Sequence, residues 1–150
     1  MAMTMNGQVQ LAASRDVVWA KLNDPEVLKS CIPGSEQFDK ISDGEFQAIA
    51  TVKVGPVKAR WKGKVRLSDL DPPNSYRISG EGEGGVAGFA RGGAKVSLSD
   101  KDGGTLLTYD VEAQIGGKLA QLGQRLINSA AKKTAEDFFE KFATAVSAGG

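Results

Sequence analysis

The stretch that decides the fold is Val57-Lys-Ala-Arg-Trp-Lys-Gly-Lys-Val-Arg-Leu67, whose side chains alternate in kind. Every even position is Lys or Arg, and every odd position is apolar or Gly. Because successive side chains of a β-strand point to opposite faces, this period of two predicts a strand with one wet face and one buried face. An antiparallel sheet that is covered on one side is therefore expected.

The residues just before this stretch predict its partner strand. Apolar side chains occupy alternate positions there: Phe46, Ala48, Ala50, Val52 and Val54. Gly55-Pro56 then fits a two-residue type II′ turn, whose first central position favours Gly. This turn places Val54 opposite Val57 and Glu45 opposite Arg66, so the two segments form a hairpin with a fixed register.

The same period continues on the C-terminal side of the hairpin. Three further segments alternate in this way, at residues 76–82, 94–98 and 107–115, and the turn-forming runs 72–74 and 100–104 separate them. A meander of consecutive antiparallel strands is expected. Residues 118–147 contain no proline and return to a helical period, which predicts one long C-terminal helix of roughly 45 Å at ~1.5 Å per residue.

The N-terminal part predicts one strand and two short helices. Residues 7–12 alternate, and Ser14 can cap a helix that carries Val18, Trp19 and Leu22. Asp24 can cap a second helix with Pro25 at its first position, a place where proline is well tolerated. The expected fold class is therefore α+β: a curved antiparallel sheet of about seven strands wrapped around the long helix, with two short helices after the first strand.

Length and charge narrow the classes of function. The 150 residues fit a single domain, 1–150, and a formal net charge of +1 offers no field that would gather nucleic acid. Residues 1–13 lack the basic start and apolar run of a signal peptide, and the single Cys31 cannot form an internal disulfide. No apolar run is long enough to span a bilayer. A cytoplasmic location is expected.

The absence of histidine limits the chemistry further. Without imidazole the chain lacks the commonest general base and the commonest zinc and haem ligand. One cysteine cannot hold a structural zinc or an iron–sulfur cluster, and Cys31 has no histidine to activate it. We therefore expect no catalytic residue, no metal site and no intrinsic cofactor.

The C-terminal helix and the inner sheet face both carry unusually small side chains. Large residues lie near the two ends of the helix, and Ala130, Ala131, Thr134 and Ala135 lie between them. This segment is called the waist. The strands facing it are also rich in Ala and Gly. Small residues can let helix and sheet approach closely; alternatively, two lean surfaces leave a pocket for an apolar ligand. We favour the pocket, with these predicted ligand-binding residues: Trp61, Tyr76, Phe89, Tyr109, Leu122, Leu126, Ala130 and Phe138.

Two other patterns have more than one interpretation. Gly80-Glu-Gly-Glu-Gly-Gly85 matches a nucleotide-binding glycine motif, but no helix follows it, so a flexible apolar hairpin tip around Phe89 is favoured, either as a plain loop or as a lid. The basic strip, defined as the outward-facing Lys58, Arg60, Lys62, Lys64 and Arg66, is typical of a solvated face paired with acids on neighbouring strands. It is also compatible with docking of an acidic partner.

Several segments together resemble the CoxG family of carbon monoxide dehydrogenase accessory proteins. They are Val18-Trp-Ala-Lys-Leu-Asn-Asp-Pro-Glu-Val-Leu28, Cys31-Ile-Pro-Gly34, Val54-Gly-Pro-Val-Lys-Ala-Arg-Trp-Lys-Gly-Lys-Val65 and Tyr109-Asp-Val-Glu-Ala-Gln-Ile-Gly-Gly-Lys-Leu-Ala-Gln-Leu-Gly123. The resemblance implies a helix-grip fold of the START and polyketide-cyclase-like superfamily. It also implies a non-catalytic accessory protein of a molybdenum hydroxylase of the carbon monoxide dehydrogenase type, tied to membrane recruitment and to delivery of electrons to quinone.

Joined to the lean interior, the resemblance leads to one expectation and two alternatives. The expectation is a carrier whose partners are an apolar small molecule (a bound quinone or another lipid), the hydroxylase, and the inner membrane face as a peripheral contact. Many members of the family continue into an apolar membrane tail, whereas this sequence stops at Ala148-Gly-Gly150, so anchoring by a tail is open. The first alternative is a protein–protein adaptor that recruits the hydroxylase without a ligand. The second is a cyclase- or aromatase-like enzyme of the same superfamily, which would require inward-facing acids or bases.

Overall fold

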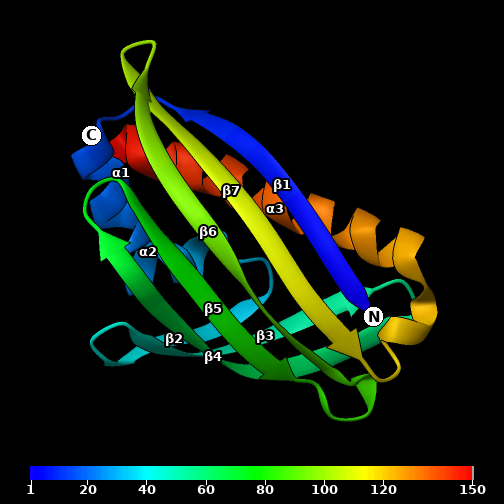
Figure 1. Ribbon diagram of the computed structural model, residues 1–150. Coiled ribbons are helices and arrows are strands. Elements are labelled where there is room, and N and C mark those ends of the chain that lie inside the picture. The colour runs from blue at the N-terminus through cyan, green and yellow to red at the C-terminus, as the bar shows by residue number, and fades with distance from the viewer. Residues whose placement is uncertain (150) are drawn as a thin grey trace.

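A computed structural model describes the backbone of residues 1–149 and the side chains of residues 1–147 (Figure 1). Seven strands, three α-helices and two 3₁₀ turns follow one another in this part of the chain. In chain order they are β1 (Ala2–Leu11), α1 (Arg15–Leu22), α2 (Pro25–Cys31), β2 (Ser35–Ser42), β3 (Glu45–Val54), β4 (Val57–Asp71), β5 (Ser75–Glu83), η1 (Gly85–Ala87), β6 (Phe89–Lys101), β7 (Gly104–Gly116), η2 (Ala120–Leu122) and α3 (Gln124–Gly149).

The strands form one antiparallel sheet in the order β1-β7-β6-β5-β4-β3-β2. The predicted hairpin register is confirmed, since Val54 pairs with Val57 and Glu45 pairs with Arg66. Gly55 has a φ of +55°, which the first central position of a type II′ turn requires. The predicted α+β class, with two short helices after the first strand and a long C-terminal helix, is also confirmed.

The caps of the two short helices lie where the sequence placed them. The Ser14 hydroxyl accepts a hydrogen bond from the amide of Val17 at 3.4 Å, and the Asp24 carboxylate accepts one from the amide of Glu26 at 3.0 Å. Both bonds satisfy donors that the first turn of a helix leaves free. Only Asn23 and Asp24 separate α1 from α2, so the helices stay close together and cover one end of the sheet.

The long helix begins later than predicted. α3 starts at Gln124 rather than near residue 118, because Gly123 has a φ of +93° and interrupts the helical backbone. Residues 120–122 form a separate 3₁₀ turn, so Leu119 and Leu122 precede the helix instead of lying on it. With 26 residues, α3 is about 39 Å long at ~1.5 Å per residue. Thr134 is exposed, and its hydroxyl donates back to the carbonyl of Ala130.

A strand that the sequence did not predict completes the sheet. β2 pairs with β3 at the outer edge and contains two register shifts. Its single buried side chain, Phe38, stacks on Phe46 of β3 with ring centroids 5.2 Å apart.

The helix α3 runs diagonally behind the sheet in Figure 1, nearest to β1. Its C-terminal end meets α1 and α2, and its N-terminal end lies near the start of β1. The sheet therefore has an inner face toward α3 and an outer face toward solvent. Within residues 1–149, no helix combines the length and hydropathy needed to cross a bilayer.

Candidate functional site

Aromatic side chains fill one end of the interior. Tyr109 of β7 stacks on Phe139 of α3 with ring centroids 5.1 Å apart, and Phe138 meets Phe142 at 5.8 Å. These residues belong to a cluster that includes Leu11, Val18, Leu107 and Val146, each buried to within 1% of complete burial. This region, where α1, α2 and the C-terminal half of α3 meet the sheet, is called the dense end.

A second, separate cluster lies around the N-terminal end of α3. Met3, Ile115, Leu119 and Ile127 form it, and Trp61 and Leu122 pack against it while remaining partly exposed. A third cluster joins Leu28, Phe38 and Phe46 beneath α2. A domain of this size usually has one contiguous core with minor satellites, so a core divided along the length of α3 is unusual.

The segment between the first two clusters has the small side chains that the sequence predicted. On the helix side it contains Ala130, Ala131 and Ala135, which are neither fully buried nor fully exposed. Across from them, a Cβ placed on Gly80 or Gly82 would have only atoms of the adjacent strand β4 as its nearest neighbours, at 3.2 Å or more. The helix therefore does not use these two glycines to approach the sheet, and the close-approach interpretation is wrong at these positions.

The inner face that borders this gap is uncharged. The carboxylates of the central strands point outward: Glu45, Glu81, Glu83, Asp110 and Glu112. The basic strip on β4 also points outward, as predicted. Such an interior suits an apolar molecule, because a charged one would lose its hydration without gaining a partner.

The eight predicted ligand-binding residues do not all lie together. Tyr76, Tyr109 and Phe138 belong to or pack on the cluster at the dense end, whereas Trp61 and Leu122 pack on the second cluster, and Ala130 lies on the waist. Leu126 is 37% exposed, and its side chain contacts the Gly55 turn. Phe89 lies on the outer face, where its ring covers Gly116. Contact of these residues with a ligand stays a prediction.

Loops gather around the N-terminal end of α3, a region called the open end. It comprises Met1, the Gly55-Pro56 turn, residues 84–88 and residues 116–123. The amide of Leu119 donates to the carbonyl of Ala87 at 2.9 Å, and Gly84 packs on the Trp61 indole. The glycine-rich loop is thus held at two points, while its tip, Val86, is 89% exposed. A 3₁₀ turn follows the Gly80–Gly85 motif, so no helix N-terminus is available for a nucleotide phosphate.

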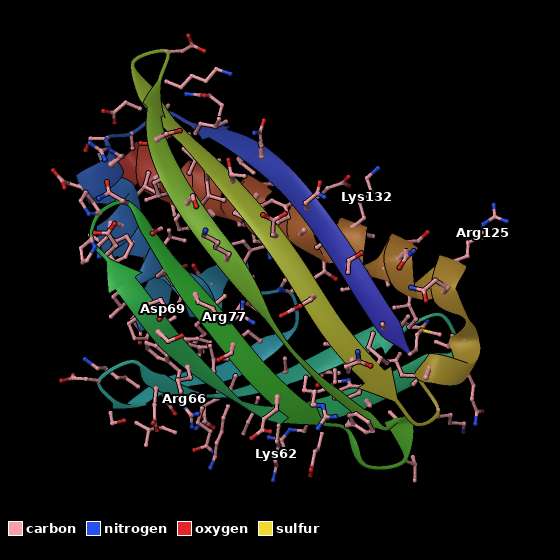
Figure 2. The ribbon with its side chains drawn as sticks, viewed as in Figure 1. Lys62, Arg66, Asp69, Arg77, Arg125 and Lys132 are labelled. Carbon is pink, nitrogen blue, oxygen red and sulfur yellow. The ribbon has the colours of Figure 1, made fainter. Side chains whose placement is uncertain are left out.

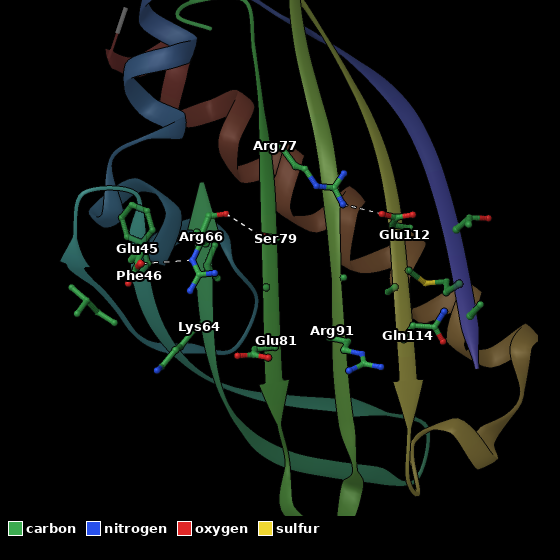
Figure 3. Close-up of a pocket in the computed structure, with 18 residues that line it drawn as sticks. Glu45, Phe46, Lys64, Arg66, Arg77, Ser79, Glu81, Arg91, Glu112 and Gln114 are labelled. Carbon is green, nitrogen blue, oxygen red and sulfur yellow. Dashed lines mark hydrogen bonds and ion pairs between the residues drawn. The ribbon is translucent and has the colours of Figure 1, made fainter. Parts of the chain in front are cut away.

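The outer face contains a groove that the sequence did not reveal. It has a volume of about 640 Å³ and crosses β4, β5, β6 and β7 (Figure 3). Arg77 reaches across β6 to Glu112, with a 2.9 Å ion pair, and Arg66 meets Glu45 at 3.7 Å. Gly93 makes the first pair possible, since a Cβ there would lie 2.8 Å from the Arg77 guanidinium. The paired charges make this groove polar and nearly balanced.

A second groove of about 430 Å³ adjoins the first and extends to Phe89. The two share Lys64, Glu81 and Arg91. Neither groove includes the waist of α3, so both are distinct from the interior gap. Their existence depends on the twist and bend of the sheet, which strand alternation does not encode.

Cys31 fits the structural role that the sequence favoured. Its side chain is 1% exposed within the core at the dense end, and burial raises the pKa of its thiol. A raised thiol pKa lowers the thiolate fraction at neutral pH, which disfavours nucleophilic chemistry.

Together, the curved antiparallel sheet, the long helix behind it and the uncharged interior define a helix-grip protein of the START-like class. Solved structures of that class share the fold. The chain superimposes on a START superfamily protein from Mycobacterium smegmatis with a TM-score of 0.75 at 13% identity, covering 98% of this chain and 99% of that one. The Zhui aromatase/cyclase from Streptomyces sp. R1128 gives 0.72 at 14% identity, with 98% and 94% covered.

Within that class, the chain belongs to the carbon monoxide dehydrogenase CoxG family, whose model matches residues 7–147. A conserved protein from Geobacillus kaustophilus is 32% identical and superimposes with a TM-score of 0.91, covering 97% of this chain and 95% of that one. The comparison with curated proteins gave no match. The family's name associates the chain with carbon monoxide dehydrogenase as an accessory component.

Proposed function

We propose that the protein binds an apolar molecule, a quinone or another lipid, between the waist of α3 and the inner face of the sheet. As an accessory of a molybdenum hydroxylase of the carbon monoxide dehydrogenase type, it presents this molecule to the enzyme and so links the enzyme to a membrane electron acceptor. The protein itself has no catalytic role. The observation that carries the proposal is the divided core, with an uncharged gap between two packed clusters.

The energetics of such a site suit a long apolar chain. Burying hydrocarbon contributes ~0.8 kcal/mol per CH₂ group, so several buried groups give useful affinity without any charged contact. A bound quinone supplies the redox chemistry itself, which is consistent with a chain that offers neither histidine nor a cysteine pair. The function then requires only that the ligand enter and leave.

The open end has the properties expected of the part that meets a membrane. Its exposed apolar side chains include Val86 and Leu126. The segments 53–62, 84–89 and 116–126 together contain lysine and arginine but no carboxylate. Apolar tips surrounded by cations favour the surface of an anionic bilayer. Peripheral contact at the inner membrane face through this end supports ligand exchange with the bilayer.

Extraction of the protein from its host tests the ligand directly. The protein is purified without detergent, extracted with organic solvent and analysed by mass spectrometry. We expect a prenylated or acyl molecule in near-stoichiometric amount. A protein that is empty after purification and that also takes up no added quinone analogue would contradict the proposal.

A second candidate function is recruitment of the hydroxylase through the basic strip without a ligand. Arg60 and Arg66 of the strip form ion pairs with Glu36 and Glu45, as expected of a solvated face. Lys58, Lys62 and Lys64 form no ion pair within the described part of the chain, which leaves them available to an acidic partner.

Charge reversal separates this adaptor function from ligand carriage. Changing Lys58, Lys62 and Lys64 to Glu should abolish co-purification with the hydroxylase if the basic strip is the docking surface, and ligand content should not change. Reversal of three exposed lysines elsewhere, Lys29, Lys101 and Lys132, is the matched control. Equal recovery of the enzyme with both triple variants would remove the basic strip from consideration.

A further inference from the structure

The inner face of the sheet contains few polar groups, and one of them is deeply buried. Tyr76 of β5 is 5% exposed and points inward at the dense end. Its ring meets Trp19 of α1 edge to face, with centroids 5.4 Å apart. On the sheet it pairs with Val96, which in turn pairs with Tyr109.

The Tyr76 hydroxyl forms no hydrogen bond with any residue from 1 to 147. In this part of the chain, every fully buried side-chain nitrogen or oxygen has a partner. The unpartnered hydroxyl must therefore still border an open space, although its residue is almost completely buried. Because Tyr76 points to the inner face, that space lies inside the protein.

Such an arrangement is unusual for a tyrosine in a core. A buried tyrosine normally places its O–H against an acceptor, because an unpaired polar group removed from water is costly. Desolvation by burial raises the pKa of Tyr76, so the hydroxyl keeps its proton at neutral pH and can act only as a neutral group. As a donor, it lacks an acceptor that the protein does not supply.

We propose that Tyr76 donates a hydrogen bond to an uncharged oxygen, such as a carbonyl, at the polar end of the bound apolar ligand. The inference rests on the proposed function and adds an orientation and a chemical class to it. The polar end lies at the dense end beside α1, and the apolar remainder runs along the waist toward the open end.

The surroundings select a neutral acceptor over an anion. No lysine or arginine accompanies Tyr76 on the inner face: the cations of β4, β5 and β6 point outward. A carboxylate or phosphate would therefore be desolvated there without a counter-charge. A ketone, quinone or ester needs one donor only, which Tyr76 provides.

The second inward tyrosine is placed differently. The Tyr109 hydroxyl lies over Gly7 of β1, where a Cβ would overlap it, and its ring stacks on Phe139. Tyr109 therefore contributes an apolar surface between β1 and α3. Tyr76 is the inward tyrosine whose hydroxyl lies at the centre of the sheet, and so it is the residue to test.

The test compares two probes of the same length in wild-type protein and in Tyr76→Phe. Decylubiquinone has carbonyl oxygens and decylbenzene has none; quenching of the fluorescence of Trp19 and Trp61 reports the binding of either. We expect Tyr76→Phe to weaken decylubiquinone binding about 3- to 10-fold, the effect of one neutral hydrogen bond, and to leave decylbenzene unaffected. Ser97→Ala, which removes a hydroxyl from the outer face of β6, should change neither affinity.

The outcomes separate this inference from the function on which it rests. If wild-type protein binds neither probe, the proposed function is wrong. If wild-type protein binds decylubiquinone and Tyr76→Phe binds it equally well, the hydroxyl meets only water and the inference is wrong. Equal weakening of both probes would show a packing effect and would also contradict it. Thermal unfolding provides a second readout, because Tyr76→Phe loses no hydrogen bond within the protein and should melt no lower than wild type.

Discussion

Two glycines of neighbouring strands illustrate how single residues divide the sheet into structural and functional positions. At Gly92 of β6, a Cβ would overlap the carbonyl oxygen of Glu112 and lie 2.7 Å from the Cα of Ala113. At Gly82 of β5, the nearest atom would be 3.6 Å away, which is an ordinary contact. Neither residue has a positive φ. Gly92 is therefore required by the backbone, whereas Gly82 is not.

We predict opposite stability effects for the two alanine variants. Gly92→Ala should lower the free energy of unfolding by about 1–3 kcal/mol, because overpacking forces two strands apart. Gly82→Ala should raise it by about 0.5 kcal/mol, since alanine restricts the unfolded chain without strain. Urea unfolding measures both. The added methyl group of Gly82→Ala projects toward the interior, so quinone binding should weaken although stability rises. A Gly82→Ala variant that is destabilised would indicate a filled interior.

At the scale of the elements, α3 contains two parts with different duties. Its C-terminal half carries Phe142 and Val146, both completely buried between the sheet, α1 and α2. Its first turns carry Leu126, which is 37% exposed beside the Gly55 turn. The waist separates them. The C-terminal half therefore anchors the helix, and the N-terminal half borders the open end.

This division predicts a gradient of mutational cost along α3. Phe142→Ala should lower the free energy of unfolding by about 3–5 kcal/mol, because it leaves a cavity in the packed core. Leu126→Ala should cost less than about 1 kcal/mol, since part of the side chain is already in water. Chemical denaturation of both variants measures the difference. Similar losses for the two would mean that the helix is gripped evenly along its length.

The elements also show what the sequence could and could not predict. The β3–β4 hairpin was predictable because strict alternation and a Gly-Pro turn both fix its register. β2 was missed because it buries only Phe38, so its edge position leaves almost no period. The helix start was wrong because nothing in residues 118–123 except Gly123 interrupts a helical pattern, and its positive φ is a property of the fold.

For the site, the lean surfaces were visible in the sequence, but their grouping was not. Inward phase identified Trp61, Tyr76 and Tyr109 correctly, because the period of two determines the face of a strand. It could not show that Trp61 lies with the second cluster and Tyr76 with the first. Nor could it predict the unpartnered hydroxyl of Tyr76, since hydrogen-bond partners depend on how α1 packs on the sheet.

At the scale of the whole molecule, the two ends differ in charge and in packing. The dense end closes with α1 and α2 and buries its large apolar residues. The open end exposes Val86 at 89% and places Lys53, Lys58 and Arg125 around it; the Arg125 side chain extends away from the start of α3 in Figure 2. An asymmetric molecule of this kind orients on a charged surface. The open end therefore should face the bilayer while the ligand's polar end stays at the dense end.

Vesicle binding tests this orientation. We expect wild-type protein to sediment with vesicles of phosphatidylcholine and phosphatidylglycerol, but weakly with phosphatidylcholine alone, and salt should reduce the binding. Changing Lys53 and Lys58 to Ala removes about 2 kcal/mol of attraction, which is a roughly 30-fold loss of affinity. Val86→Asp should also weaken binding, whereas Leu70→Asp, at an exposed apolar residue near the opposite end of β4, should not. Equal binding to both vesicle types, or equal loss with Val86→Asp and Leu70→Asp, would contradict the orientation, because neither charge nor the open end would then direct the contact.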